Sequence, residues 1–404
     1  MKTKIMALTL FTCTTAAITL YPYYQSFGAI NPFQTVTPIQ PMTNQVTNGR
    51  HQIEVVFALD TTGSMGGLIE AAKEKIWSIA SNMGSAQSAP EIKMGLVAYR
   101  DRGDAYVTKV FDLSSDLDSM YANLMDFRAA GGGDGPESVN QALYDAVNRI
   151  GWSQDSNTYR VVFLVGDAPP HMDYQDDVKY PETIALAKSR GIVINTIQAG
   201  NNKKTGKRWN QIAQIGGGQF FEVGQNGSAV AIATPFDKKL AKLSRELDDT
   251  RLYYGTKKER AKQQKKVEAS DKLHASASIE SRARRATFNS SKSGKTNFLG
   301  KQELIDDIAS GRVDLDKIEA EKLPDAIQAM APVEQKAEIK KKAQKRDELQ
   351  RQIGALAKQR SSYLSDQVEK NGGAKDSLDR KIFEAVKEQA KGAGLSYESE
   401  DISY

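Results

Sequence analysis

The sequence predicts an α/β protein: a doubly wound, mostly parallel sheet with one antiparallel strand, followed by a helical C-terminal region. Two observations lead to this prediction. Between residues 51 and 235, short continuous apolar runs alternate with stretches of helical spacing, which is typical of parallel strands covered by helices on both faces. Beyond residue 240 charged residues become much more frequent, and apolar residues keep only helical spacing.

The expected strands are the apolar runs, which are rich in β-branched residues and bounded by turn residues. They cover 55–59, 94–99, 106–111, 161–165, 192–197 and 219–223. Helices are expected between them, at 66–83, 117–127, 137–150, 182–189 and 209–215. The segment that joins the second strand to the third is too short for a crossover, so we expect this pair to form an antiparallel hairpin.

The first 29 residues have the features of a secretory signal peptide. Lys2 and Lys4 precede an apolar stretch that is short for a membrane span. We therefore expect an exported protein, periplasmic or extracellular, with an uncleaved membrane anchor as the alternative. Lipid attachment at Cys13 is disfavoured by the bulky residue before it. Because Cys13 is the single cysteine, cleavage would leave a mature chain without disulfides, and no later apolar run is long enough to span a bilayer.

Composition divides the remaining chain into four parts. Residues 30–50 are rich in Pro, Thr, Gln and Asn and are expected to be a linker, and 51–235 form the α/β domain. Residues 236–300 begin with a charged helix and continue with a Lys-, Arg- and Ser-rich stretch that we expect to be flexible in part. Residues 301–404 are expected to be helical.

The long helix expected at 333–368 carries Leu349, Ile353, Leu356 and Tyr363 on one seam. This pattern indicates a helical hairpin or a coiled-coil appendage, through which the chain could self-associate. Residues 241–404 contain 34 Lys and Arg against 28 Asp and Glu, so the positive charge lies in this part. The charge is mixed in sign and has no basic stripe with interleaved aromatic residues, which argues against nucleic-acid binding.

Three acidic segments follow predicted strands or lie in loops beside them. They are Asp60 with Thr62 and Ser64, Asp134 after three glycines, and Asp167 directly after "RVVFLVG" (160–166). The carboxyl ends of the strands in an open α/β sheet form its ligand crevice, so we expect these segments to converge. Carboxylates and hydroxyls are hard oxygen ligands that suit Mg²⁺, Mn²⁺ or Ca²⁺.

Each segment also has a simple structural interpretation. Thr62 or Ser64 could cap the following helix. Asp134 could close the glycine turn, with Glu137 complementing the dipole of the next helix. Asp167 could be an ordinary turn residue. The three segments together favour the metal site, because they occur in the order and spacing of one family.

The motifs "DTTGSM" (60–65), "GGGDGPES" (131–138) and "FLVGDAPPH" (163–171) resemble those of von Willebrand factor A domains that carry a metal-ion-dependent adhesion site. The sequence looks like the bacterial and alpha-kinase-associated branch of that family, in which "AYRDRGD" (98–104) also has counterparts. The resemblance covers roughly residues 51–235. Thr62 stands where Ser is usual, and Asp134 stands where many members have Thr.

The resemblance implies that Asp60, Thr62 and Ser64 hold the ion and that Asp134 and Asp167 complete its ligands. The expected ion is Mg²⁺, with Mn²⁺ or Ca²⁺ as alternatives. Such a site leaves one position open for water or for an Asp or Glu of a partner protein. The carboxylate of Asp134 should tighten the binding of metal and weaken the attraction for an acidic ligand.

Other polar residues should line the rim of the same face. Arg100, Asp101 and Asp104 follow the second strand, and His171 follows the third acidic segment. Residues 102–104 spell the Arg-Gly-Asp tripeptide, which a hairpin turn explains without any receptor. An aspartyl-phosphate nucleophile at Asp60 is disfavoured, since such phosphatases need a second aspartate where Thr62 stands.

We therefore expect an exported, metal-dependent protein-binding module for adhesion or assembly, with no catalytic residue. Two alternatives stay open. A metal-assisted hydrolase would use His171 as a general base. A structural scaffold would assemble through the C-terminal helices.

Overall fold

The computed structural model describes residues 50–133, 135–227, 232–370 and 378–397. The predicted signal peptide, the predicted linker apart from Arg50, and Asp134 lie outside these residues. Within the described residues, no helix is both long enough and apolar enough to cross a membrane.

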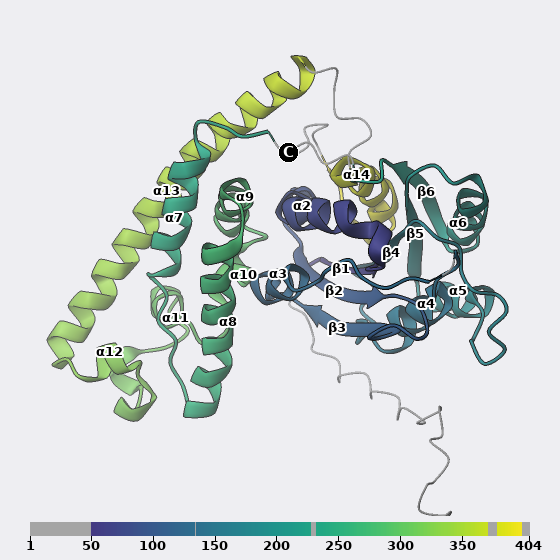
Figure 1. Ribbon diagram of the computed structural model, residues 1–404. Coiled ribbons are helices and arrows are strands. Elements are labelled where there is room, and N and C mark those ends of the chain that lie inside the picture. Colours follow the sequence, from purple (N-terminus) through teal and green to yellow (C-terminus); the bar gives the residue numbers. More distant parts are fainter. Residues whose placement is uncertain (1–49, 134, 228–231, 371–377, 398–404) are drawn as a thin grey trace, which may run out of the picture. The chain divides into compact units, whose positions relative to one another are not determined.

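The described residues form one six-stranded sheet with the order β3-β2-β1-β4-β5-β6 (Figure 1). The strands are β1 (Gln52–Asp60), β2 (Glu91–Tyr99), β3 (Thr108–Ser114), β4 (Thr158–Gly166), β5 (Ile192–Ala199) and β6 (Gly217–Val223). Only the β2–β3 pair is antiparallel among these strands, and all other neighbours are parallel. The predicted α/β fold and its antiparallel hairpin are confirmed.

Side chains of β1 alternate between two apolar cores, because successive residues of a strand point to opposite faces. Val55 and Leu59 belong to one core, and Val56 and Ala58 belong to the other. Both sets are almost fully buried, which explains why the strand is a continuous apolar run.

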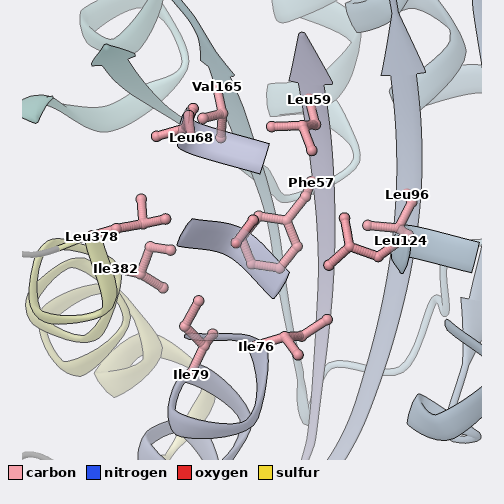
Figure 2. Close-up of a pocket in the computed structure, with 11 residues that line it drawn as sticks. Phe57, Leu59, Leu68, Ile76, Ile79, Leu96, Leu124, Val165, Leu378 and Ile382 are labelled. Carbon is pink, nitrogen blue, oxygen red and sulfur yellow. The ribbon is translucent and has the colours of Figure 1, made fainter. Parts of the chain in front are cut away.

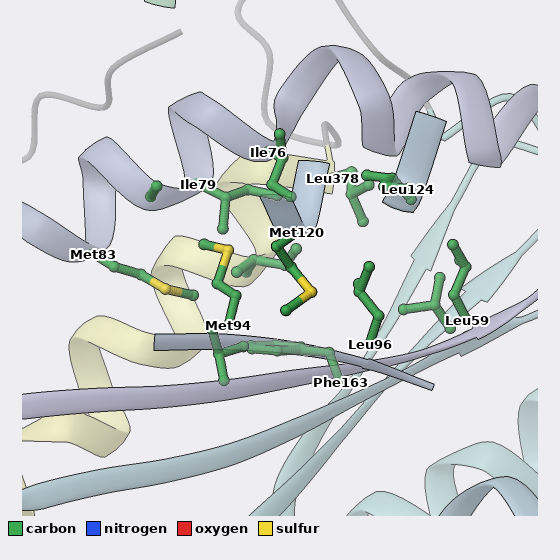
Figure 3. Close-up of a cluster of buried hydrophobic side chains, with 14 of the residues drawn as sticks. Leu59, Ile76, Ile79, Met83, Met94, Leu96, Met120, Leu124, Phe163 and Leu378 are labelled. Carbon is green, nitrogen blue, oxygen red and sulfur yellow. The ribbon is translucent and has the colours of Figure 1, made fainter. Parts of the chain in front are cut away.

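Helices cover both faces of the sheet. One core is formed with α2 (Gly66–Gly84), α3 (Leu117–Met125) and α14 (Leu378–Gln389), and Figure 3 shows its leucine, isoleucine and methionine side chains. The other is formed with α4 (Val139–Asn148), α5 (Tyr180–Ser189) and α6 (Lys203–Ile215). The helices expected in 51–235 are all present, although α5 and α6 begin earlier than the sequence predicted.

Residues 236–370 form a helical region. Its longer helices are α7 (Asp237–Asp248), α8 (Lys257–Ser276), α9 (Ile279–Asn289) and α13 (Pro332–Lys370), and its short ones are α10 (Lys295–Leu299), α11 (Leu304–Ala309) and α12 (Asp325–Gln328). The stretch 254–300, expected to be flexible in part, instead contains α8, α9 and α10. Large apolar residues are few there, but Ala283 and Ala286 of α9 are fully buried and let neighbouring helices approach closely.

The seam of the long helix α13 is covered within the chain. Leu349 and Ile353 are fully buried in a cluster with Leu240 and Leu247 of α7. The ring of Tyr363 packs edge-on against Phe236 at 6.4 Å between centroids. Residues of the same chain therefore pack against this seam. The domain boundaries that the sequence predicts at 236 and 301 stay predictions.

The helix α14 returns to the sheet after the helical region. Its Asp379 makes an ion pair of 3.1 Å with Lys75 of α2, and both side chains are fully buried. Gln389, also on α14, exchanges hydrogen bonds with Asn195 of β5 at 2.8 and 2.9 Å. Figure 2 shows Leu378 and Ile382 pointing into a small apolar cavity between α14, α2 and the sheet. A segment distant in sequence thus completes one face of the sheet.

Candidate metal centre

Asp60 is the last residue of β1 and is fully buried. Its Oδ1 accepts hydrogen bonds from the backbone N–H and the hydroxyl of Thr62, at 2.8 and 2.7 Å. Thr62 makes no side-chain cap to a helix, and α2 begins after Met65, also without a side-chain cap. The first acidic segment is therefore folded onto its own aspartate and does not serve as a helix cap.

The second carboxylate oxygen of Asp60, Oδ2, is buried and has no hydrogen-bond partner. Burial raises the pKa of Asp60 to about 7, and the negative charge of Asp167 adds to this, while the Thr62 hydrogen bonds and Arg100 lower it. A carboxylate in this condition gains most from a nearby cation.

Asp167 follows β4, the direct parallel neighbour of β1. Its Oδ2 accepts a hydrogen bond of 2.8 Å from the side-chain amide of Gln225, which also donates to the backbone oxygen of Ser64 at 3.3 Å. Gln225 thereby joins two of the predicted segments, a role that no sequence pattern indicates. Ser64 itself is exposed.

Gly166, the last residue of β4, allows β4 to pass close to Asp60 of β1 and Tyr99 of β2. A Cβ at this position would lie 2.5 Å from the hydroxyl of Tyr99 and 3.0 Å from the Cβ of Asp60. The first distance is shorter than real Cβ atoms show and the second is tight, so any larger residue would displace the Tyr99 hydroxyl and press on Asp60.

Glu137 is a site residue that the sequence analysis missed. It was expected to complement the dipole of the following helix, but α4 begins at Val139 and has no acidic residue in its first turn. Instead Glu137 forms a bridge with Pro170, and its side chain is buried, with Oε2 lacking a partner. A Cβ on Gly132 would lie 3.1 Å from Oε1 of Glu137 and 3.2 Å from Cβ of Thr62, which places Glu137 beside the first segment.

The pKa of Glu137 is raised to about 9. Burial is the main cause, followed by the charges of Asp60, Asp101, Asp104 and Asp167. The carboxylates of the first and third segments and of the rim therefore act on one another at this edge of the sheet.

The rim carboxylates are held by hydrogen bonds. Asp101 accepts from the hydroxyls of Ser138 at 2.9 Å and Tyr174 at 2.9 Å. Asp104 accepts from the backbone N–H of Gly132 at 3.0 Å. Arg102 bonds to Asp176 and Asp177, so the Arg-Gly-Asp tripeptide has its two charged side chains engaged within the chain.

Arg100 and His171 contact the loops at this edge of the sheet. The guanidinium of Arg100 donates to the backbone oxygens of Thr61 at 3.1 Å and Arg128 at 2.8 Å. The ring of His171 lies 2.8 Å from Asp173 through Nδ1 and 3.3 Å from Asp101 through Nε2, and it is 4% exposed. Because both ring nitrogens face carboxylates, this geometry fits a residue that positions the loop better than a general base.

The donor set fits a hard divalent cation. Asp60 and Glu137 have raised pKa values, and each buries a carboxylate oxygen that has no hydrogen-bond partner and lies near further carboxylates. Within the part of the chain that is described, no group of three or more His, Cys, Asp or Glu side chains forms a ready-made metal cage. The candidate set is therefore mixed and needs the hydroxyls of Thr62 and Ser64 as well as carboxylates.

The structure thus brings Asp60, Thr62 and Asp167 to one edge of the sheet and surrounds them with the predicted rim residues, which are Arg100, Asp101, Asp104 and His171. Asp134 lies outside the described residues, although its neighbours Gly132 and Glu137 border the site. Metal ligation by any of these residues stays a prediction.

Residues 54–228 match the family model of the von Willebrand factor A domain. Among curated proteins, the chain is 31% identical over 120 residues to the "Alpha-protein kinase vwkA" of Dictyostelium discoideum, covering 30% of this chain and 19% of that protein. It is 28% identical over 119 residues to a putative ariadne-like RING finger protein of Acanthamoeba polyphaga mimivirus, covering 30% and 11%. The chain therefore spans less than a fifth of the length of either relative.

Solved structures with a similar arrangement include proximal thread matrix protein 1 from the mussel byssus. It is 14% identical with a TM-score of 0.34, and the match covers 44% of this chain and 43% of that one. The SpRpn10 VWA domain is 13% identical with a TM-score of 0.33, covering 43% of this chain and 88% of that one.

Proposed function

We propose that the von Willebrand factor A domain at residues 54–228 binds a partner protein through a divalent cation held at the carboxyl ends of β1 and β4. Domains of this family are generally protein-interaction modules. The cation would supply a Lewis-acidic position that an oxygen atom of the partner can occupy.

One observation carries this proposal: Asp60 and Glu137 each bury a carboxylate oxygen without a partner, and each lies in the field of further carboxylates. An uncompensated buried charge is costly, and a bound cation would remove that cost. The proposed ligands are the carboxylates of Asp60, Glu137 and Asp167 and the hydroxyls of Thr62 and Ser64. Asp134 stays a proposed ligand from the sequence.

Mg²⁺, Mn²⁺ and Ca²⁺ are all compatible with oxygen donors. The predicted signal peptide at 1–29 makes the periplasm or the extracellular space the proposed location.

The two alternatives have less support. A hydrolase would need a base that faces the metal-bound water, but the ring of His171 is buried between Asp101 and Asp173. A scaffold that assembles through the seam of α13 would need that seam to be free, but Leu349 and Ile353 pack against α7.

The test is the melting temperature of the full chain with chelator and with Mg²⁺, Mn²⁺ or Ca²⁺. At a hundred times its Kd, a cation that binds the folded chain stabilises it by about 2.7 kcal/mol. We expect Asp60→Asn to remove most of this gain, because Asn keeps the hydrogen bonds to Thr62 but loses the charge.

The matched control is Asp126→Asn, which neutralises a carboxylate that is 68% exposed and paired with Lys272. It should leave the metal-induced shift unchanged. A shift of the same size in Asp60→Asn and in the unmodified chain would rule out the proposed site.

A further inference from the structure

We infer that a cleft in the helical region binds a zwitterionic dipeptide with apolar side chains. The cleft has a volume of about 380 Å³ and lies between the end of α9, the short helices α10 and α11, and the middle of α13. Small-molecule sites in proteins occupy about 300–1,000 Å³, so the cleft fits a small ligand of this kind. None of the residues that line it belongs to the candidate metal centre, so this site is independent of the proposed function.

The floor of the cleft is apolar and forms where two buried clusters meet. Phe298 and Leu299 belong to the cluster that α7 and α13 share, whereas Ile305 belongs to the cluster that includes α11 and α12. These three side chains are 1%, 8% and 2% exposed. Apolar side chains of a ligand would extend this floor, because removing apolar surface from water is favourable.

Hydrogen bonds within the chain hold the walls of the cleft. Arg346 of α13 donates from Nη1 and Nη2 to the carboxylate of Glu303 at 2.8 Å each, which ties α13 to the start of α11. In the loop after α9, the hydroxyl of Ser293 donates to the backbone oxygen of the last residue of α2 at 2.8 Å. The backbone oxygen of Lys292 accepts from Arg50 at 3.1 Å. The cleft is therefore largely preformed, as small-molecule sites usually are.

Two opposite charges that line the cleft have no partner within the chain. The guanidinium of Arg346 is committed to α11, and Lys295 is paired with Asp306 at 2.9 Å. By contrast, Lys292 of the loop after α9 and Asp347 of α13 are exposed, and neither forms an ion pair with a residue that the structure describes. One positive and one negative group, on different walls, favour a ligand that carries both charges over a plain anion or cation.

Buried donors beside Lys292 indicate which end of the ligand lies there. The hydroxyl of Ser290 and Nδ2 of Asn289 are buried without a partner. The amide of Asn289 is fixed in orientation, because its Oδ1 accepts from Asn297 at 2.7 Å and Asn297 in turn accepts from the backbone N–H of Leu117 at 2.7 Å. A donor that is buried without an acceptor is costly, and a ligand carboxylate can satisfy the Ser290 hydroxyl after a rotation of that side chain.

These features assign a place to each part of the dipeptide. Its carboxylate lies toward Ser290 and Lys292, its ammonium lies toward Asp347, and its apolar side chains cover Phe298. Gln350 lines the cleft on the same wall as Asp347, and its side-chain amide can bond to the peptide group between the two ends.

The first experiment tests the class of ligand by calorimetric titration of the full chain. The probes are leucyl-leucine, its N-acetyl derivative, its C-terminal amide and glycyl-glycine. We expect leucyl-leucine to bind, and each of the others to bind about tenfold more weakly or worse, because it lacks one charged end or the apolar side chains. No binding of leucyl-leucine, or equal affinities for all the probes, would overturn the inference.

The second experiment tests the position of the carboxylate. Lys292→Gln should weaken the binding of leucyl-leucine about tenfold and leave the binding of its amide unchanged, because the amide has no carboxylate to lose a partner. The matched control is Lys341→Gln on α13, whose side chain is 80% exposed and does not line the cleft. It should leave both affinities unchanged. Equal weakening of the peptide and its amide by Lys292→Gln would contradict the assigned contact.

The third experiment fills the cleft. Ala309 lines it and is exposed, so Ala309→Trp adds bulk there without entering a buried cluster. We expect this variant to lose the binding of leucyl-leucine while it keeps the melting temperature of the unmodified chain. Undiminished binding in Ala309→Trp would place the peptide outside the cleft. Chelator should not change the affinity of the unmodified chain, so a failure of the proposed metal centre and a failure of this site are distinguishable.

Discussion

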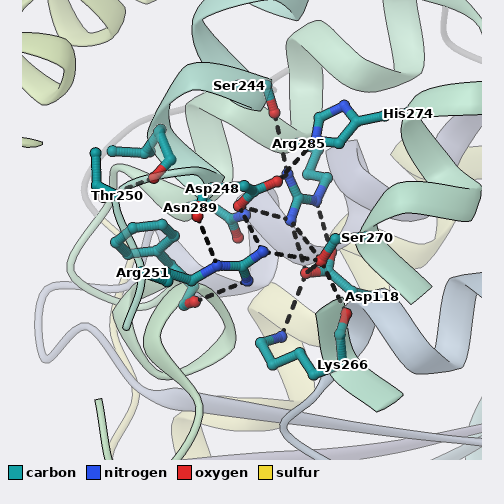
Figure 4. Close-up of polar contacts among 12 residues, drawn as sticks. Asp118, Ser244, Asp248, Thr250, Arg251, Lys266, Ser270, His274, Arg285 and Asn289 are labelled. Carbon is teal, nitrogen blue, oxygen red and sulfur yellow. Dashed lines mark hydrogen bonds and ion pairs between the residues drawn. The ribbon is translucent and has the colours of Figure 1, made fainter. Parts of the chain in front are cut away.

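Two groups of buried carboxylates in this chain differ in what lies opposite them. At the candidate metal centre, Asp60 and Glu137 are 0% and 4% exposed and face further carboxylates. Where α3 meets the helical region, Asp118 of α3 and Asp248 of α7 are 0% and 9% exposed and lie on either side of Arg285 of α9 (Figure 4). We call the second group the Arg285 node.

Arg285 is fully buried and bonds to both aspartates of the node. Its Nε and Nη2 donate to Asp118 at 2.6 and 2.7 Å, and its Nη1 donates to Asp248 at 2.7 Å. Lys266 and Arg251 add ion pairs of 3.3 and 3.2 Å. Burial alone would raise the pKa of Asp118 and of Asp248, but these cations, led by Arg285, hold both well below the ordinary value.

Burial and charge compensation have separate effects on the pKa values of these carboxylates. Both groups are removed from water, yet their pKa values move in opposite directions, because the chain supplies cations to one group and leaves a deficit at the other. A divalent cation would supply the positive charge that is missing at the candidate metal centre.

The largest expected effect comes from removing the compensating cation of the node. Arg285→Met leaves Asp118 and Asp248 buried with fewer positive charges. Breaking a buried ion pair costs about 3–5 kcal/mol, and we expect about 3 here because Lys266 and Arg251 remain. Urea unfolding of the full chain measures the loss.

Arg312→Met is the matched control for that measurement. Arg312 also contacts two aspartates, Asp306 and Asp307, but its side chain is 54% exposed. We expect a change within about 0.5 kcal/mol. If the two variants unfold alike, the buried node contributes no more than a surface pair.

An intermediate effect, opposite in sign at the two groups, is expected from neutralising one carboxylate of each. Asp248→Asn should lower the free energy of unfolding by about 1–3 kcal/mol, because it weakens a charge-assisted bond to Arg285. In chelator at neutral pH, Glu137→Gln should raise that free energy by about 1 kcal/mol, because a carboxyl with a raised pKa must take up a proton when the chain folds, whereas Gln does not titrate. A loss of stability in both variants would show that the two groups do not differ.

The smallest effect is expected from mild acidification at the node. The folded-state pKa of Asp248 lies below the ordinary value of about 4, so its stabilisation is complete above that value and is lost as the pH falls through the lowered pKa. The stability gap between the unmodified chain and Asp248→Asn should therefore stay constant from pH 7.5 to 5 and narrow below pH 4. A gap that already narrows near pH 6 would contradict a lowered pKa.

The fold and the first and third segments of the site could be predicted from the sequence. Strands of continuous apolar residues have one interpretation in an α/β chain, and Asp60 and Asp167 directly follow two of them. The parallel pairing of β1 with β4 then places both residues at the same edge. The end of each strand can be recognised in the local sequence. The parallel pairing of the two strands then brings their ends together.

Glu137 could not be recognised in this way. In the sequence it stands just before a helical pattern, where an acidic residue ordinarily favours the helix dipole. Its burial depends on backbone contacts with Pro169 and His171, which lie more than thirty residues further along the chain. Local pattern carries no information about such contacts.

The Arg285 node shows the same limit where α3 meets the helical region. Asp118 and Arg285 are 167 residues apart in the sequence, on the amphipathic helices α3 and α9. Helical periodicity identifies the apolar side of a helix but does not tell which charged residue will be buried. For the same reason the sequence predicts a partly flexible segment at 254–300, although the alanines of α9 are buried there.

The return of α14 to the sheet has a consequence for synthesis and folding. Lys75 and Asp379 are separated by 304 residues, so their ion pair is a contact of very long range. At roughly 5–20 residues per second, a ribosome needs about 15–60 s to make the intervening chain. During that time the apolar face of the sheet beside α2 lacks the helix that covers it. We expect the nascent chain to depend on chaperones at this stage, and the final packing step to follow the release of residues 378–397.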